Sequence, residues 1–90
     1  MIMNLFNLKI WGVEREVFDG KASLLKLKAV DGELEILAGH IPYINALSSG
    51  KIEFQKEDGH KIVLHADSGF IKVEKNNRVY VFIQTPICVS

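Results

Sequence analysis

The sequence has little cysteine and no long apolar run. Of its 90 residues one is cysteine, Cys88, so no internal disulfide and no paired-cysteine metal site can form. This indicates a reducing compartment. No stretch approaches the roughly eighteen apolar residues that span a bilayer, so we expect no direct membrane insertion. The first residues, Met1 to Ile10, are interrupted by Asn4, Asn7 and Lys9, which is typical of a strand rather than a signal peptide.

An excess of charge of either sign is also missing. Lys plus Arg and Asp plus Glu number 11 each, so no positive field exists to hold phosphate backbones, and we expect no nucleic acid partner. Hydrophobic residues make up 48% of the chain and charged residues 24%, which is typical of a folded globular protein. Residues 1–90 are enough for a single domain, and a chain of this size buries about 60 to 65% of its unfolded surface.

Short alternating segments indicate strands. Between Ala22 and Val30, Leu25, Leu27 and Ala29 define one face and Leu24, Lys26 and Lys28 the other. Lys51–Lys56 and Lys61–Ala66 are predicted to form a hairpin, and a second hairpin joins Phe70–Lys75 to Arg78–Ile83 across Asn76-Asn77. Asp19-Gly20 is predicted to be a turn.

Two segments leave alternatives open. The spacing of Ile41, Ile44 and Leu47 also suits one or two helical turns. The segment Val79–Ile83 is apolar on both faces, so one face is expected in the core while the other meets a second sheet or a partner. With turn signals every eight to twelve residues or so, the chain is predicted to be all-β, an antiparallel β-sandwich of about eight to ten short strands.

The segment Gly32–Pro42 has the composition of a shaped loop rather than of a plain hairpin or a helix. Glycines mark positions where φ is positive or backbones approach closely, and Ile41-Pro42 holds the exit extended. Leu34 and Ile36 alternate with Glu33 and Glu35, which predicts a short strand at the start of the segment. The segment reads Gly32-Glu33-Leu34-Glu35-Ile36-Leu37-Ala38-Gly39-His40-Ile41-Pro42.

This segment resembles the Gly-Glu-Leu-Gly-Ile-Leu-Pro-Gly-His-x-Pro signature of the amino-terminal domain of the epsilon subunit of F-type, rotary ATP synthases. Glu35 stands where the family usually has glycine, and Ala38 where it usually has proline. Three flanking landmarks of the family recur in the same order, namely Phe18-Asp19-Gly20, Ser49-Gly50 and Asp67-Ser68-Gly69-Phe70-Ile71-Lys72-Val73.

The resemblance implies a non-catalytic rotor subunit on the central stalk, coupling the gamma subunit to the membrane rotor ring during proton-driven ATP synthesis. Such a subunit lies peripherally at the cytoplasmic face of a membrane. By resemblance, Asp31, Gly32 and Glu33 are expected to contact the rotor ring, and His40 and Pro42 the gamma stalk. Family members commonly continue into a carboxyl-terminal helical hairpin. We expect no such hairpin here, and therefore no braking of ATP hydrolysis and no nucleotide bound by this chain.

Catalysis and metal binding are not expected. His40, His60 and His65 fall in segments with no shared local geometry, whereas a zinc site needs about three or four converging ligands. Ser48, Ser49 and Ser68 lack a nucleophile elbow, and these observations predict no catalytic residue, no metal and no cofactor. An alternative function is that of a free-standing β-sandwich module recognising a peptide or small ligand through the Gly32 to Pro42 loop.

Overall fold

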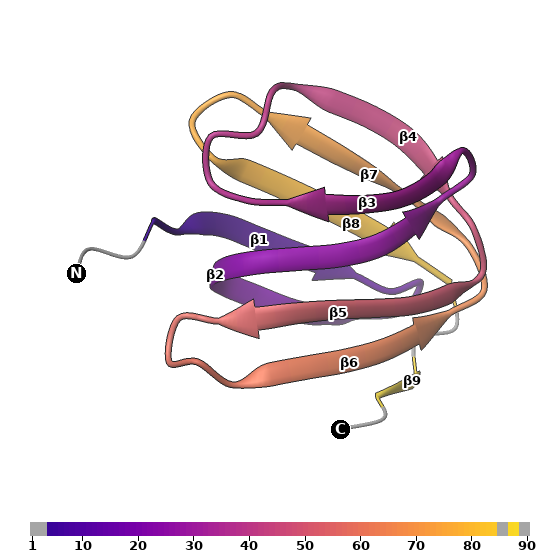
Figure 1. Ribbon diagram of the computed structural model, residues 1–90. Coiled ribbons are helices and arrows are strands. Elements are labelled where there is room, and N and C mark those ends of the chain that lie inside the picture. The colour runs from indigo at the N-terminus through magenta and orange to yellow at the C-terminus, as the bar shows by residue number, and fades with distance from the viewer. Residues whose placement is uncertain (1–3, 85–86, 89–90) are drawn as a thin grey trace.

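The computed structural model describes residues 4–84 and 87–88, and all the regular elements in these residues are strands (Figure 1). They are β1 (Phe6–Trp11), β2 (Glu16–Ala29), β3 (Gly32–Ile36), β4 (Tyr43–Leu47), β5 (Gly50–Lys56), β6 (Lys61–Ala66), β7 (Gly69–Glu74), β8 (Arg78–Ile83) and β9 (Ile87–Cys88). The predicted all-β fold is confirmed. The described residues include no helix with the length and apolar character needed to cross a membrane. Residues 1–3 of the predicted first strand lie outside the described residues.

The strands form one hydrogen-bonded sheet folded into two layers. The first layer contains β4, β7, β8, β1 and the first half of β2, and the second contains β3, the second half of β2, β5, β6 and β9 (Figure 1). Strand β2, with 14 residues, therefore belongs to both layers. Its last residue, Ala29, pairs with Leu47 of β4. Strands β1, β8, β7, β4 and β2 are therefore paired in a closed ring, which the single Ala29–Leu47 pair completes.

The Asp19-Gly20 pair lies inside β2, so the prediction of a turn there was wrong. Asp19 pairs with Lys9 and Gly20 with Leu8 in an uninterrupted antiparallel ladder, so the chain continues through both residues as a strand. A Cβ atom on Gly20 would lie 2.9 Å from Cζ of the Phe18 ring. The glycine therefore provides room for the aromatic ring beside the backbone rather than a reversal of the chain.

Both predicted hairpins are present, as β5–β6 and β7–β8. Asn76 and Asn77 have φ values of 66° and 58°, the left-handed conformation expected of asparagine in a tight turn. The segment with the ambiguous helical spacing is the strand β4, because its register with β7 pairs Ile44 with Lys72 and Leu47 with Gly69. The pairing of β1 with β8 differs from the predicted antiparallel arrangement, because these two strands run parallel whereas the other pairings of the described strands are antiparallel.

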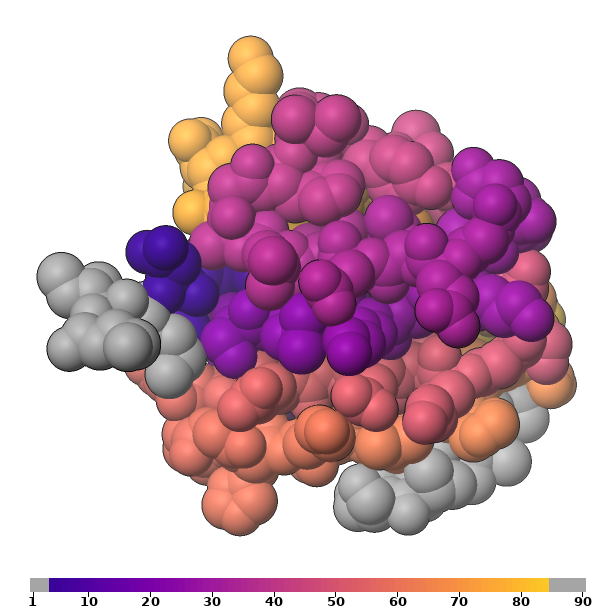
Figure 2. Space-filling view, viewed as in Figure 1, coloured from indigo at the N-terminus to yellow at the C-terminus, as the bar shows by residue number. Residues whose placement is uncertain are grey.

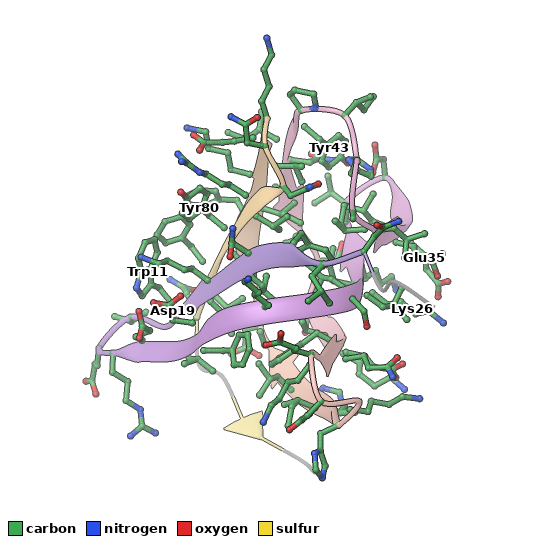
Figure 3. The ribbon with its side chains drawn as sticks, turned by 90° about the vertical axis from the view of Figure 1, so that its left-hand side faces the viewer. Trp11, Asp19, Lys26, Glu35, Tyr43 and Tyr80 are labelled. Carbon is green, nitrogen blue, oxygen red and sulfur yellow. The ribbon has the colours of Figure 1, made fainter. Side chains whose placement is uncertain are left out.

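The two layers present different outward faces. The outer face of the second layer carries alternating lysines and glutamates from β2, β3 and β5, and Figure 2 shows these strands side by side across this face. Lys26 and Glu35 belong to it, whereas Trp11 and Tyr80 lie on the opposite side of the molecule (Figure 3). The predicted partition of residues 22–30 is confirmed, with Leu25, Leu27 and Ala29 buried and Lys26 and Lys28 exposed.

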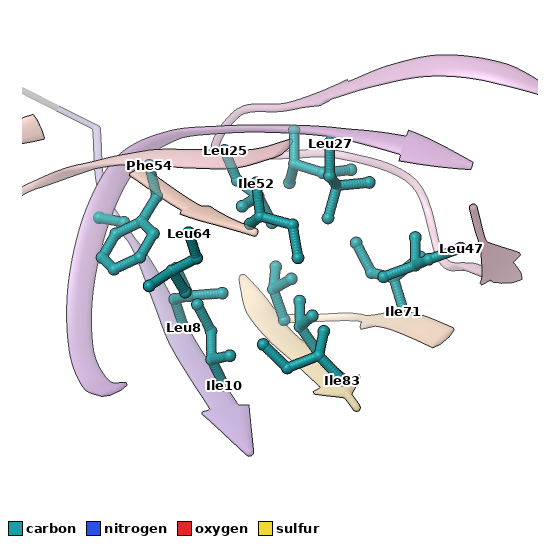
Figure 4. Packing of buried hydrophobic residues seen from close by; sticks show 14 of the residues in the cluster. Leu8, Ile10, Leu25, Leu27, Leu47, Ile52, Phe54, Leu64, Ile71 and Ile83 are labelled. Atoms are coloured by element: carbon teal, nitrogen blue, oxygen red, sulfur yellow. The ribbon is translucent and has the colours of Figure 1, made fainter. Parts of the chain in front are cut away.

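The core lies between the two layers and is apolar (Figure 4). No polar or charged residue is buried in the part of the chain that the structure describes. Burying one Leu, Ile or Phe side chain completely contributes about 1.5–3 kcal/mol. The fully buried large side chains come from six strands of both layers, so the core joins the layers. They are Phe6, Leu8, Ile10, Leu25, Ile36, Phe54, Ile71, Val79 and Val81.

Gly69 begins β7 at a point where two backbones meet. A Cβ atom at this position would fall on the carbonyl oxygen of Phe82 in β8. Gly69 also pairs with Leu47 on one side and with Ile83 on the other, so the backbone has no free direction in which to move. The glycine of this landmark is therefore required by close approach.

We predict that Gly69→Ala lowers the free energy of unfolding by about 1–3 kcal/mol, because β7 and β8 must separate to admit the methyl group. Urea denaturation followed by circular dichroism measures the change. Ser68→Ala, next along the chain and half-buried, is the control and is expected to cost less than about 1 kcal/mol. An unchanged stability for Gly69→Ala would contradict the close approach.

Candidate functional site

The turn between β2 and β3 is anchored to strand β4. The amide of Val30 donates to the carbonyl of Ala46 at 3.1 Å, and Nδ2 of Asn45 donates to Oδ1 of Asp31 at 3.1 Å. Gly32 has a φ of 136°, which a residue with a side chain rarely adopts. The side chain of Asp31 is thereby tied to the neighbouring strand, and both Asp31 and Gly32 are exposed at the end of the sandwich.

The acidic residues beside this turn face lysines across the ladder. Glu33 pairs with Lys28 in the β2–β3 register, and Oε1 of Glu35 lies 3.9 Å from Nζ of Lys26. Because exposed ion pairs are screened by water, each contributes at most about 1 kcal/mol. The pairing explains why glutamate is tolerated at position 35: its side chain points outward to solvent, opposite a lysine.

The loop between β3 and β4 begins with a tight turn over Leu37–His40. The amide of His40 donates to the carbonyl of Leu37 at 3.2 Å, and Gly39 has a φ of 86°. A hydrogen bond between the first and fourth residues, with positive φ at the third, is typical of a type II turn. In that turn the second position favours proline, and here this position is Ala38. Alanine at position 38 is compatible with this turn, but unlike proline it does not restrict φ of residue 38 in the unfolded chain.

The predicted gamma-contacting residues follow this turn. His40 is half-buried, with Nδ1 at 2.7 Å from the carbonyl oxygen of Ile41, and its ring lies edge-on to the ring of Tyr43 with 6.0 Å between centroids. Pro42 is exposed. The hydroxyl of Tyr43 accepts a hydrogen bond of 2.8 Å from Asn45.

The two sets of predicted contact residues are therefore separate. Residues 31–33 lie at the start of β3, whereas residues 40 and 42 lie beyond its end, a span of about 16 Å for five strand residues. Tyr43 and Asn45 connect the two ends along β4, because Asn45 donates to both Tyr43 and Asp31. These residues therefore do not form one site. They lie at the two ends of strand β3.

Sequence reasoning missed a row of aromatic side chains on the outer face of the first layer. We call Trp11, Phe70, Tyr80 and Phe82 the aromatic row. The ring centroids of Trp11 and Phe82 are 4.9 Å apart, those of Phe82 and Phe70 are 4.7 Å apart, and those of Trp11 and Tyr80 are 6.1 Å apart. These contacts join β1, β8 and β7, and Figure 3 shows Trp11 and Tyr80 together on this face. The doubly apolar pattern of residues 79–83 was the available signal.

Apolar surface remains exposed beside the aromatic row. Phe70 is 43% exposed and Ile44, on the neighbouring strand β4, is 67% exposed. Charged side chains surround them, since Nζ of Lys9 lies 5.5 Å from the centre of the Trp11 ring and Nζ of Lys72 lies 3.2 Å from Oε2 of Glu74. An apolar centre with a charged rim is typical of a protein–protein interface.

The three histidines do not converge. His40 follows β3, His60 precedes β6 in the hairpin turn, and His65 lies on β6. Within residues 4–84, no group of three or more His, Cys, Asp or Glu side chains is arranged to hold a metal ion. The backbone amide of His60 donates to Asp58 at 2.9 Å, and this hydrogen bond lowers the pKa of the exposed Asp58 carboxyl. The contact stabilises the hairpin turn.

A groove of about 630 Å³ crosses the charged face of the second layer. It is lined by residues of β2, β3 and β5 and by Ser49, and none of residues 37–42 lines it. Lysines and glutamates alternate along it, with Lys51 at 3.9 Å from Glu53 as well as the Lys26–Glu35 pair. Because three lysines and three glutamates line it, the groove presents no surplus charge to an ionic ligand.

Residues 5–87 match the sequence model of a family described as the ATP synthase delta/epsilon chain, β-sandwich domain. A chain of the Euglena gracilis mitochondrial ATP synthase, in a structure of OSCP, F1 and c-ring, is similar with a TM-score of 0.89 at 20% identity, over 98% of this chain and 56% of that one. A chain of the Tetrahymena thermophila mitochondrial ATP synthase central stalk and c-ring gives 0.75 at 15% identity, over 91% and 65%. These structures share the fold, and this chain spans about half to two thirds of their length.

We predict that Ala38→Pro raises the free energy of unfolding by about 0.4–1 kcal/mol, because proline at the second position of a type II turn restricts the unfolded chain. Thermal and urea unfolding measure the gain. Ala38→Ser, which leaves φ unrestricted, is the control and is expected to change stability by less than about 0.5 kcal/mol. A loss of stability in the proline variant would show that residues 37–40 do not form this turn.

Proposed function

The chain belongs to the family of the ATP synthase delta/epsilon-chain β-sandwich domain, and from this premise we propose that it is a non-catalytic subunit of the central stalk of an F-type ATP synthase. Its role is to couple the gamma subunit to the membrane rotor ring during proton-driven ATP synthesis. The family match over residues 5–87, together with the sandwich fold, carries the proposal. The chain is then a peripheral component on the cytoplasmic side of the membrane, held there by the complex.

The work of such a subunit is mechanical. It must transmit torque between two partners, and this requires a stiff body with two separate interfaces, each burying on the order of 1,000 Å² or more. A close-packed apolar core enclosed by a self-closing sheet provides the stiffness. The two sets of predicted contact residues at the two ends of β3 fit the requirement for separate interfaces. Catalysis belongs to other subunits of the complex.

For the gamma interface we propose the outer face of the first layer. The aromatic row provides apolar area in rigid rings, which interfaces favour because little side-chain entropy is lost. Ile44 and Phe70 extend this area toward β4, and His40 and Pro42 lie just before β4 begins. Apolar burial supplies the affinity, while Lys9, Lys72 and Glu74 at the rim favour one orientation.

For the rotor ring we propose the β2–β3 turn with Asp31, Gly32 and Glu33. These residues are exposed, and the carboxylate of Asp31 is held by a hydrogen bond from Asn45, so the turn presents that carboxylate in a defined position. Basic groups on the loops of the ring would pair with the carboxylates in water. Such contacts determine register and association rate more than affinity.

We predict that Ile44→Glu lowers the affinity for purified gamma subunit at least about tenfold, because a carboxylate must lose its water in an apolar interface. Isothermal titration calorimetry measures the affinity, and thermal unfolding verifies the fold. Val30→Glu is the matched control, since Val30 is 61% exposed but lies at the β2–β3 turn. An equal loss of gamma affinity in both variants would show that the first-layer face is not the gamma interface. Wild-type protein that does not bind gamma would contradict the stalk function.

We predict that Glu33→Lys slows association with the detergent-solubilised rotor ring and weakens binding up to about fivefold at low salt, because the charge that attracts basic loops is reversed. The loss should fade at higher salt as the charges are screened. Biosensor kinetics with the preformed complex of this chain and gamma provide the measurement. Glu57→Lys, an exposed residue of the β5–β6 turn, is the control. A salt-independent loss, or the same loss in the control, would argue against this contact.

A further inference from the structure

Asn77, in the turn between β7 and β8, connects three segments that are distant in sequence. Its side-chain oxygen Oδ1 accepts a hydrogen bond of 2.6 Å from the backbone amide of Gly39, which is 38 residues away. Its backbone carbonyl accepts another, of 2.7 Å, from the amide of Asn7 in β1. The first bond reaches the β3–β4 loop, and the second fixes Asn77 itself to the framework of the first layer.

The β3–β4 loop, residues 37–42, has few other ties. The remaining hydrogen bonds of this loop among the described residues are local, from His40 to Leu37 and between the His40 ring and Ile41. Leu37 is 51% exposed and Ile41 is 72% exposed, so neither side chain anchors the loop in the core. The His40 ring also packs edge-on against Tyr43, and among the described residues the bond to Asn77 is the hydrogen bond that ties the loop to a distant segment.

We propose that Asn77 is a positioning residue for the gamma interface: it holds Gly39 so that His40, Ile41 and Pro42 meet gamma in one orientation. This inference rests on the proposed function, and it adds a residue that does not itself need to touch the partner. Holding the loop before binding removes an ordering cost that would otherwise be subtracted from the affinity.

The turn provides its own matched control. Asn76 and Asn77 both adopt the left-handed conformation, with φ values of 66° and 58°, and glycine accepts that conformation without strain. Asn76→Gly and Asn77→Gly therefore make the same kind of backbone change in the same turn. Of the two side chains, that of Asn77 accepts the hydrogen bond from Gly39. Asn77→Asp keeps an acceptor oxygen at the same place and serves as the rescue variant.

Two measurements test the proposal, one without gamma and one with it. Amide hydrogen exchange by NMR should show Gly39 exchanging about twofold to tenfold faster in Asn77→Gly, since an exposed hydrogen bond is worth about 0.5–1.5 kcal/mol, while strand amides are unchanged. Calorimetric titration should show gamma affinity reduced by a similar factor. Asn76→Gly and Asn77→Asp should both remain within about twofold of wild type in both measurements.

The outcomes separate this inference from the proposed function. If wild type binds gamma and Asn77→Gly binds equally well, the positioning role is wrong and the stalk function stands. If Asn76→Gly weakens binding as much as Asn77→Gly, the turn backbone is responsible and the inference is again overturned. If wild type does not bind gamma, the proposed function fails and the positioning role for that interface fails with it, whatever the exchange of Gly39.

Discussion

The path of β2 is the constraint on which the rest of this structure depends. Its first half is hydrogen-bonded to β1, its second half lies between β3 and β5, and its last residue pairs with β4. Because one continuous strand belongs to both layers, the layers cannot slide past each other without breaking ladder hydrogen bonds. Leu25, fully buried in the second half of this strand, packs where the two layers face each other.

The outer faces of the two layers differ in chemical character. The second layer presents paired lysines and glutamates, which water solvates well, whereas the first layer presents the aromatic row with Ile44 beside it. The difference has a physical consequence for assembly, because removing the apolar first-layer face from water gains more free energy than removing the charged face. This asymmetry fits the proposed stalk function, which requires one defined orientation toward each partner.

The local backbone features of the Gly32–Pro42 segment were predictable because their signals are local, whereas the partner contacts assigned to it come from the family resemblance and stay a prediction. The positive φ of Gly32 and Gly39, the exit at Ile41-Pro42 and the exposed carboxylates of residues 31–33 all follow from a few neighbouring letters. The contacts that hold these residues in place were not predictable. Asn77 reaches Gly39 across 38 residues, and the aromatic row combines three strands whose order in the sheet no local pattern encodes. At Asp19-Gly20 the local signal was misleading. Both residue types favour turns, but here both residues pair with β1 and continue the strand.

The sequence by itself determined the all-β class, the two hairpins and the buried side of residues 22–30, because alternation of apolar and polar residues and turn chemistry act over a few positions. Tertiary structure alone decided that β2 serves both layers, that β1 runs parallel to β8, and that the outer face of residues 79–83 stacks on Trp11 and Phe70. These features depend on which distant strands share hydrogen bonds. Which strands pair depends on the packing of the whole core, so it cannot be read from any single segment of the sequence.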